Sequence, residues 1–178
     1  MRIIAGSLKS RTFDSVSGHR THPMSEKIRG AIFNALGDIK GLTVLDAFAG
    51  TGAVSFEALS RGAKSATLLD ADTKAHKVIQ QNTANLGLDN QVDSLRIHAH
   101  AWSRRNPDAK FDIVILDPPY DNISPKELLV LTKHVKQGGV LVLSLPPDNG
   151  FLLGESKQEL LLQKNYGDAE LFFYRQLV

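Results

Sequence analysis

Residues 111–120, Phe-Asp-Ile-Val-Ile-Leu-Asp-Pro-Pro-Tyr, form an apolar run that ends in an acid, two prolines and an aromatic residue. Proline lacks a backbone N–H and fixes φ, so the carbonyl oxygens near Asp117 and Pro118 can face a ligand as hydrogen-bond acceptors. Two acceptors on one exocyclic NH2 group of a base would aim its nitrogen lone pair at a methyl donor. Tyr120 can stack on that base, an interaction worth roughly 1 to 3 kcal/mol. We expect Asp117, Pro118, Pro119 and Tyr120 to form the catalytic corner of an amino methyltransferase.

A pair of glycines follows an earlier apolar run. Residues 43–48 are mostly apolar, Gly50 and Gly52 come next, and a helical pattern begins after them. Paired glycines let the backbone turn sharply and approach a ligand, and the N-terminus of the following helix adds free N–H groups. The sequence therefore predicts a ligand-binding loop between a strand and a helix, although a plain tight turn would carry the same glycines.

The residues around the glycines separate three kinds of ligand. A triphosphate loop ends in Gly-Lys-Ser/Thr, whereas Gly52 is followed by Ala53 and Val54, which argues against a nucleoside triphosphate. A dinucleotide loop has a third glycine where this chain has Ser55, and Asp46 would repel a pyrophosphate; that alternative is weakened and stays open. S-adenosylmethionine has no phosphate and carries a positive sulfonium and ammonium, so Asp46 favours it.

An acid farther along the chain fits the same cofactor. Asp70 ends the second apolar run, where it can accept hydrogen bonds from ribose hydroxyls, although a carboxylate that starts the next helix is the structural alternative. The adenine edge would lie near His100 and Ala101. The residues expected at the cofactor are Asp46, Phe48, Gly50, Gly52, Asp70, Ala71, His100 and Ala101.

The elements that must position these residues alternate in type. Strands are expected at 43–48, 65–70, 95–98, 113–117, 140–145, 159–163 and 170–175, and helices at 25–36, 53–61, 73–86 and 125–136. Alternating strands and helices indicate parallel βαβ units and a doubly wound α/β sheet. In such sheets ligands bind beyond the carboxyl ends of the strands, which is where both motifs lie.

Composition sets the frame for this fold. The chain has 178 residues, 42% of them hydrophobic, and no cysteine, which fits one compact domain without disulfides, zinc ribbons or iron–sulfur clusters. His98 and His100 lack an obvious third ligand, so we expect no metal. The apolar runs are too short to span a bilayer and no secretory signal is present, so we expect a cytoplasmic protein without a membrane partner.

Charge is distributed unevenly along the chain. Residues 1–29 hold six Lys or Arg residues against two acids, a net charge of +4, so the remaining residues of this +2 protein sum to −2. We divide the chain into a basic N-terminal arm or hairpin, 1–24, and a domain, 25–178. Because RNA needs its phosphates neutralised, we expect the basic segment to contact RNA. The residues expected to do so are Arg2, Lys9, Arg11, Arg20, His22, Lys27 and Arg29.

Several motifs together resemble one family. Residues 46–52, 57–63 and 117–120, with the opening at 2–6 and the Tyr-Gly-Asp at 166–168, are similar to the RsmD-type bacterial small-subunit rRNA guanine-N2 methyltransferases. The likeness covers nearly the whole chain. The glycine and Asp-Pro-Pro-Tyr motifs alone indicate an amino methyltransferase; the arm and the short length point to this family.

The resemblance implies more than the motifs do. It implies a Rossmann-like class I S-adenosylmethionine-dependent methyltransferase sheet of seven mostly parallel strands, the last antiparallel. It implies S-adenosylmethionine as donor and the N2 amino group of a guanine in 16S rRNA as acceptor, within a ribosomal subunit or assembly intermediate, with the enzyme a monomer. Residues 21–24 should border the pocket, which adds Pro23 and Met24 to the cofactor residues. The chain departs from the family pattern at His22, usually Arg, at Met24, usually Thr, at Gly30, usually Glu, and at Asp70, usually Glu.

Three other functions remain as alternatives. An adenine-N6 methyltransferase acting on DNA or RNA would use the same catalytic corner, although the length leaves no room for the extra segment that DNA enzymes use to flip a base. A catalytically silent RNA-binding or assembly protein could keep the fold. A nicotinamide dehydrogenase would use the dinucleotide version of the loop.

Overall fold

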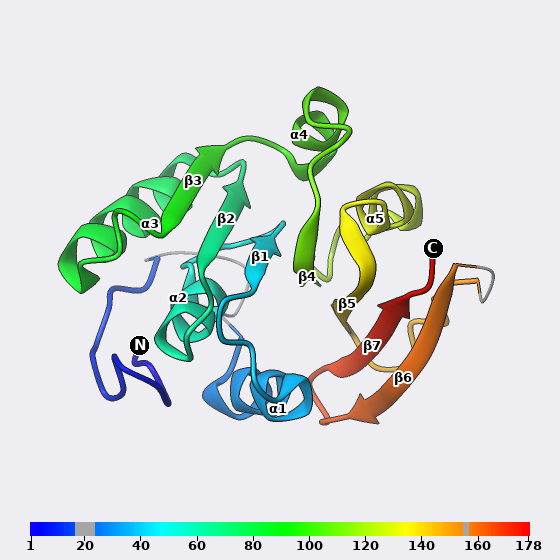
Figure 1. The fold of residues 1–178 in the computed structure, drawn as a ribbon, viewed down its shortest axis with the longest axis horizontal. Coiled ribbons are helices and arrows are strands. Elements are labelled where there is room, and N and C mark those ends of the chain that lie inside the picture. The colour runs from blue at the N-terminus through cyan, green and yellow to red at the C-terminus, as the bar shows by residue number, and fades with distance from the viewer. Residues whose placement is uncertain (17–23, 155–156) are drawn as a thin grey trace.

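The computed structural model describes residues 1–16, 24–154 and 157–178, and over these residues seven strands form one sheet (Figure 1). The helices are α1 (Glu26–Leu36), α2 (Ala53–Ser60), α3 (Thr73–Leu86), α4 (Ala99–Arg105) and α5 (Pro125–Thr132). The strands are β1 (Thr43–Asp46), β2 (Ser65–Asp70), β3 (Val92–Arg96), β4 (Phe111–Leu116), β5 (Val135–Leu145), β6 (Gln158–Asn165) and β7 (Glu170–Gln176).

Strand order in the sheet is β3-β2-β1-β4-β5-β7-β6. Each neighbouring pair from β3 to β5 is parallel, and β7 runs antiparallel to both β5 and β6. The expected doubly wound sheet with an antiparallel last strand is confirmed. This is the Rossmann-like class I methyltransferase fold.

Helices cover the two faces of the sheet in separate layers (Figure 1). One core cluster packs Ile32 of α1, Phe56 of α2 and Ile79 of α3 against the sheet. A second cluster packs Trp102 of α4 and Leu128 of α5 against the other face. Because the central strands are buried on both faces, their sequences are continuous apolar runs rather than alternating ones. This pattern allowed the strands to be predicted from the sequence.

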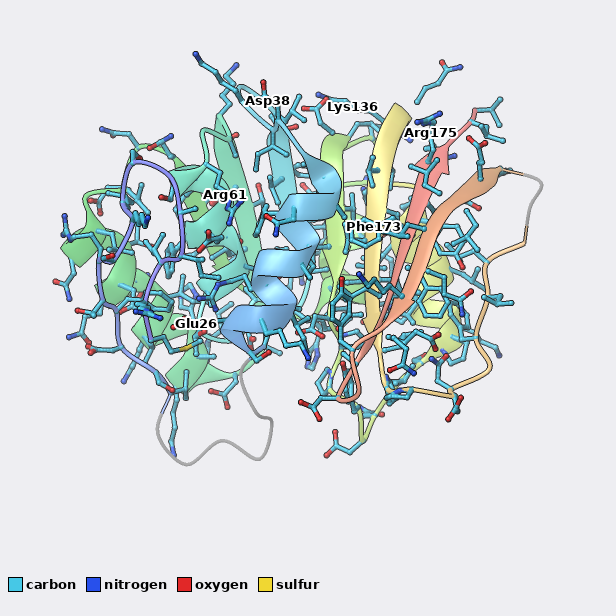
Figure 2. The ribbon with its side chains drawn as sticks, turned by 90° about the horizontal axis from the view of Figure 1, so that it is seen from below. Glu26, Asp38, Arg61, Lys136, Phe173 and Arg175 are labelled. Atoms are coloured by element: carbon cyan, nitrogen blue, oxygen red, sulfur yellow. The ribbon has the colours of Figure 1, made fainter. Side chains whose placement is uncertain are left out.

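The two ends of the strands carry different parts of the chain. Glu26, at the start of α1, lies at the edge where the parallel strands end, whereas Asp38 and Lys136 lie at the opposite edge (Figure 2). Arg175 lies at that far edge too because β7 runs the other way. Within the three described ranges, no helix has both the length and the apolar character needed to cross a bilayer.

Two predicted elements differ from the structure on the α4–α5 face. The helix expected at 125–136 ends at Thr132, and β5 begins at Val135, which pairs with Phe111. The buried His134 ring makes this early stop possible because its nitrogens lie 2.8 Å from the Ala109 carbonyl oxygen and 2.8 Å from the Ser103 hydroxyl. Polar partners on both sides hold the turn between helix and strand.

The other difference concerns the segment around the two histidines. The strand expected at 95–98 is β3, which spans Val92–Arg96, and the chain then turns into α4, which the sequence did not reveal. A helix of this length has too few turns to show a helical period, but it buries Trp102, whose ring centroid lies 4.9 Å from that of His134.

Residues 1–16 fold back onto α2 and α3 rather than extending away from the domain. Arg2 and Thr12 form an isolated antiparallel bridge, the small hairpin that was expected. Ile3 and Phe13 are buried in the main core, and the Phe13 ring lies edge-on to Phe56 with centroids 5.5 Å apart. The hairpin is therefore part of the same packed body as the sheet.

The buried carboxylate of Glu57 holds this hairpin against α2. The Glu57 side chain has no exposed surface, and its carboxylate accepts the backbone N–H groups of Ile4 (2.8 Å) and Ala5 (3.1 Å) and the Nε–H of Arg61 (2.8 Å). The equally buried Arg29 places its Nε 3.6 Å from the same carboxylate. The sequence interpretation of Glu57 as a structural residue is consistent with this environment.

We expect Glu57→Gln to lower the free energy of unfolding by about 3 to 5 kcal/mol, because the buried Arg29 guanidinium would lose its counter-charge. The matched control is Glu26→Gln, which breaks the exposed pair between Arg2 and Glu26 and should cost less than about 1 kcal/mol. Urea unfolding of the two variants and the parent protein measures both values. Equal effects of the two substitutions would contradict this account of the cluster.

Candidate active site

A cavity of about 1010 Å³ lies at the carboxyl ends of the parallel strands. It is lined from the strand ends, from the start of α1 and from the turn before β7. The expected site residues that line it are Met24, Asp46, Phe48, Gly50, Asp70, Ala71, Asp117, Pro118, Pro119 and Tyr120. Residues far apart in sequence thus meet at the edge that the strand pattern indicated. Pro23, which was expected beside Met24, lies outside the described residues.

The two glycines of the loop have different roles. Gly50 lines the cavity and has a φ of 54°. Gly52 caps α2 with a φ of 79° and is absent from the cavity lining; a Cβ there would come within 2.7 Å of the Phe56 ring. We therefore assign Gly52 to the tight packing of the loop on its helix rather than to contact with a ligand.

Asp46, the last residue of β1, is a buried acid in the cavity wall. Its carboxylate accepts a hydrogen bond of 2.8 Å from the Ser55 hydroxyl of α2. Burial raises the pKa of Asp46 to about 7, and the neighbouring charges of Asp117 and Asp70 add to the rise. Desolvation thus disfavours the ionised form, so a cation in the cavity would be stabilised by this group and would stabilise its charge in return.

Asp70 has a structural task in addition to its place in the cavity wall. One carboxylate oxygen accepts the N–H of Gly50 and the other accepts the N–H of Asp72, each at 2.8 Å. The acid therefore fixes the glycine loop against the end of β2. Each carboxylate oxygen has a second lone pair, so this geometry is compatible with the predicted contact to ribose hydroxyls.

The adenine side of the expected site is displaced by two residues. The cavity is lined by Ile97, His98 and Ala99, and neither His100 nor Ala101 is among its lining residues. Both lie on α4, where the backbone N–H of His100 donates to the Glu127 carboxylate at 3.1 Å. The helix, which the sequence did not reveal, carries these two residues past the cavity.

The Asp-Pro-Pro-Tyr corner follows β4 into the middle of the cavity. Burial raises the pKa of Asp117 to about 6, and a hydrogen bond with Ser144 opposes the rise. Tyr120 is 41% exposed as a whole residue, and its hydroxyl lies 3.1 Å from the Ser144 hydroxyl. A flat ring beside a desolvated acceptor is an arrangement that can hold a base and present its amino group to Asp117.

Ser144 is a site residue that the sequence interpretation missed. It is buried on β5 and contacts both the acid and the tyrosine of the corner. The only signal was one hydroxyl within the apolar run Val140–Leu145. Asp168 and Glu127 also line the cavity without having been expected there.

The basic residues of the arm are in several environments. Arg29 is fully buried, and its Nη2 donates to the Arg2 carbonyl at 2.6 Å, so the expectation that it contacts RNA is wrong. A charge with no exposed surface cannot reach a phosphate. Lys9, Arg11 and Lys27 are exposed, and Arg11 also donates to the Asn85 carbonyl at 2.9 Å.

Three of the predicted RNA contacts need separate mention. Arg2 is exposed and paired with Glu26 at 3.0 Å. Arg20 and His22 lie outside the described residues. The exposed, described part of the predicted RNA surface is therefore Arg2, Lys9, Arg11 and Lys27.

The raised pKa of Asp46 predicts how stability changes with pH in the ligand-free protein. The unfolded carboxyl has a pKa of about 3.9, so the folded state holds this proton more tightly, and the resulting stability is present below about pH 4 and lost as pH rises through about 7. Asp46→Asn keeps an acceptor for Ser55 but cannot ionise. Between pH 4 and pH 8, we expect wild type to lose up to about 4 kcal/mol of unfolding free energy relative to the variant. Urea unfolding at a series of pH values measures the difference, and a pH-independent difference would refute the assignment.

Comparison with known proteins connects this geometry to a family. A family model described as "Conserved hypothetical protein 95" matches residues 1–175. A Bacillus subtilis protein named "Putative rRNA methyltransferase YlbH" is 34% identical over 173 residues, covering 94% of this chain and 89% of its own. A Buchnera aphidicola protein named "Ribosomal RNA small subunit methyltransferase D" is 30% identical over 168 residues, covering 92% and 83%.

Solved structures agree with the fold. An Escherichia coli protein described as "Putative methyltransferase yhhF" superimposes with a TM-score of 0.88 at 25% identity, covering 99% of this chain and 98% of its own. The match runs through the N-terminal hairpin as well as the sheet. The chain therefore belongs to the family described as Conserved hypothetical protein 95, the RsmD-type family whose motifs its sequence carries.

Proposed function

We propose that this protein transfers a methyl group from S-adenosylmethionine to the exocyclic N2 amino group of a guanine in small-subunit rRNA. The observation that carries the proposal is the desolvated Asp117 in the same cavity wall as the partly exposed Tyr120 and as Asp46. A poor amine nucleophile needs an acceptor and a stacking platform more than it needs a strong base. The relatives named as rRNA methyltransferases support rRNA as the substrate class.

The charge of the cavity fits the cofactor. Its lining contains seven carboxylate side chains and, among the described residues, no Lys or Arg. The acids are Asp46, Asp70, Asp72, Asp117, Asp121, Glu127 and Asp168. A ligand with a sulfonium and an ammonium is favoured there, and one with a pyrophosphate is disfavoured. Phe48 and Ile97 offer apolar surface for an adenine ring.

Asp117 has two tasks in the proposed reaction. When bound, S-adenosylmethionine supplies a methyl group on a positively charged sulfur, and the methyl–sulfur bond breaks with its electron pair left on sulfur. Asp117 and the Pro118 carbonyl accept hydrogen bonds from the amino group and aim its lone pair at the methyl carbon. As the nitrogen–carbon bond forms, Asp117 takes the proton that the nitrogen loses and returns it to water. Most of the rate enhancement then comes from orientation and electrostatics.

RNA would reach this acidic cavity through the hairpin and α1. Lys27 is exposed on α1, whose start lines the cavity through Met24 and Ser25, and Lys9 and Arg11 are exposed on the hairpin. Arg2 adds a fourth exposed cation. These cations can neutralise phosphates while the carboxylates inside the cavity hold the donor.

The direct test is to incubate the protein with labelled S-adenosylmethionine and small ribosomal subunits from cells lacking this gene. Digestion of the rRNA to nucleosides should place the label in N2-methylguanosine. Label in N6-methyladenosine, or none in any nucleoside while S-adenosylhomocysteine still binds, would reject the proposal in favour of the adenine enzyme or the catalytically silent protein.

Asp117→Ala should reduce kcat/KM for methyl transfer by at least about 100-fold, as loss of a preorganised electrostatic group does in other enzymes. Affinity for S-adenosylhomocysteine, measured by calorimetry, should change by less than about threefold, because that ligand has no amino group at the acceptor position. For the parent protein, activity should rise with pH through about 6 as Asp117 ionises. Turnover of Asp117→Ala near the wild-type rate would remove Asp117 from the mechanism.

Tyr120→Ala should lower kcat/KM for RNA by roughly 5- to 100-fold, the range expected for a lost base–aromatic stack. Tyr120→Phe is the matched control, since it keeps the ring and removes only the hydroxyl contact with Ser144. Initial rates at several subunit concentrations measure both variants. If the two variants are equally impaired, the hydroxyl rather than the ring is what matters.

A further inference from the structure

The strand order divides the cavity into two halves. Asp46, Asp70 and His98 follow or end β1, β2 and β3, which lie on one side of β4 in the sheet. Ser144 of β5 and Asp168 before β7 lie on the other side. Asp117 comes from β4, between the two halves. If the first half holds the donor, the second half must hold the base.

Asp168 is the carboxylate that the turn before β7 adds to this second half, whereas Asp121 and Glu127 come from the segment between β4 and β5. It lies in the turn between β6 and β7, and the first residue of β7, Glu170, pairs with Leu145 at the carboxyl end of β5. The turn is thereby held beside Ser144, whose hydroxyl contacts Tyr120. Asp168 and Tyr120 both line the cavity; burial is the main cause of the raised pKa of the Tyr120 phenol, and the charges of Asp117 and then Asp168 add to it.

The Asp168 side chain is available for a ligand. It is exposed at the cavity wall, and within the part of the chain that the structure describes its carboxylate makes no hydrogen bond or ion pair. By contrast, the carboxylate of Glu170 on the same hairpin accepts a hydrogen bond of 2.8 Å from Gln163. An ionised carboxylate can only accept hydrogen bonds, so a ligand group opposite Asp168 must be a donor.

Guanine and adenine differ at N1, the ring nitrogen next to the carbon that bears the amino group. In guanine, N1 carries a hydrogen and stands beside the N2 amino group, so two neighbouring atoms donate. In adenine, N1 is an acceptor beside the N6 amino group. Its lone pair would face the lone pairs of a carboxylate, and the two acceptors would repel each other. A carboxylate facing N1 therefore accepts a hydrogen bond from guanine, whereas with adenine two acceptors face each other and no hydrogen bond forms.

We propose that Asp168 accepts a hydrogen bond from N1–H of the target guanine while Asp117 accepts from its N2 amino group, and that Asp168 thereby selects guanine over adenine. This inference rests on the proposed function. It makes the turn before β7 the specificity-determining element of the site. Asp168 is a specificity residue that takes no part in the transfer itself.

The test compares Asp168→Asn with Glu170→Gln, a matched control that removes one negative charge from the same hairpin outside the cavity. Asp168→Asn should lower kcat/KM for a small-subunit rRNA fragment carrying the target guanine by about 3- to 10-fold, because the asparagine oxygen can still accept from N1–H but the hydrogen bond loses its charge assistance. Glu170→Gln should change it by less than about threefold, and S-adenosylhomocysteine should bind both variants with wild-type affinity, which also shows that they fold.

A second substrate separates base recognition from a general effect. The same fragment with 2-aminopurine at the target position keeps the amino group but has an acceptor at N1. Wild type should methylate it at least about 10-fold less efficiently than guanine, and Asp168→Asn should shrink or reverse that preference because the asparagine NH2 can donate to N1.

The possible outcomes separate the role of Asp168 from the proposed function. An unchanged preference in Asp168→Asn, or weakened S-adenosylhomocysteine binding, overturns the role of Asp168 and leaves the proposed function in place when wild type still forms N2-methylguanosine. Absence of N2-methylguanosine with wild type overturns the proposed function and this inference together.

Discussion

A carboxylate without access to water must be met by donors on every side, and Glu57 of α2 is such a group. Its donors come from the hairpin, from α2 itself and from α1, so one buried charge joins three segments. The hairpin approaches α2 so closely that a Cβ on Gly6 would lie 1.8 Å from the Ser60 carbonyl oxygen. Because the glycine loop leads into α2, the position of that loop depends on the same cluster.

Ionised acids buried in the cavity wall destabilise the ligand-free protein, and a bound ligand can offset this destabilisation. Asp46 and Asp117 both have raised pKa values because their surroundings withhold water from the charge. A cationic ligand stabilises both ionised forms, whereas a polyanion cannot approach them without phosphate neutralisation elsewhere. The exposed cations Lys9, Arg11 and Lys27 lie outside the cavity lining, so the protein keeps these cations apart from the acids of the cavity.

The sequence predicted the parts of the site that depend on short-range pattern. The run that ends at Asp117 and the glycines after Asp46 could be placed because buried parallel strands are continuous apolar runs followed by their loops. Contacts made across the sheet had no such signal. Ser144 is one hydroxyl in an apolar strand, and Arg29 looks like an RNA-binding residue until its partner Glu57, far along the chain, is brought beside it. Likewise α4 is too short to have a period, and because of it the cavity is lined by His98 and Ala99 rather than by the expected His100 and Ala101.

The position of the chemistry follows from the topology. β1 and β4 are neighbours at the point where the strand order reverses, so their following loops diverge and leave a crevice between Asp46 and Asp117. The antiparallel β7 adds what a purely parallel sheet would lack. A parallel strand in its place would begin at the opposite edge, with its start far from the cavity. Because β7 runs the other way, its first residues meet the end of β5, and the turn that carries Asp168 becomes part of the cavity wall. The one reversed strand thus lets a tight hairpin turn contribute a side chain to the cavity wall beside β5.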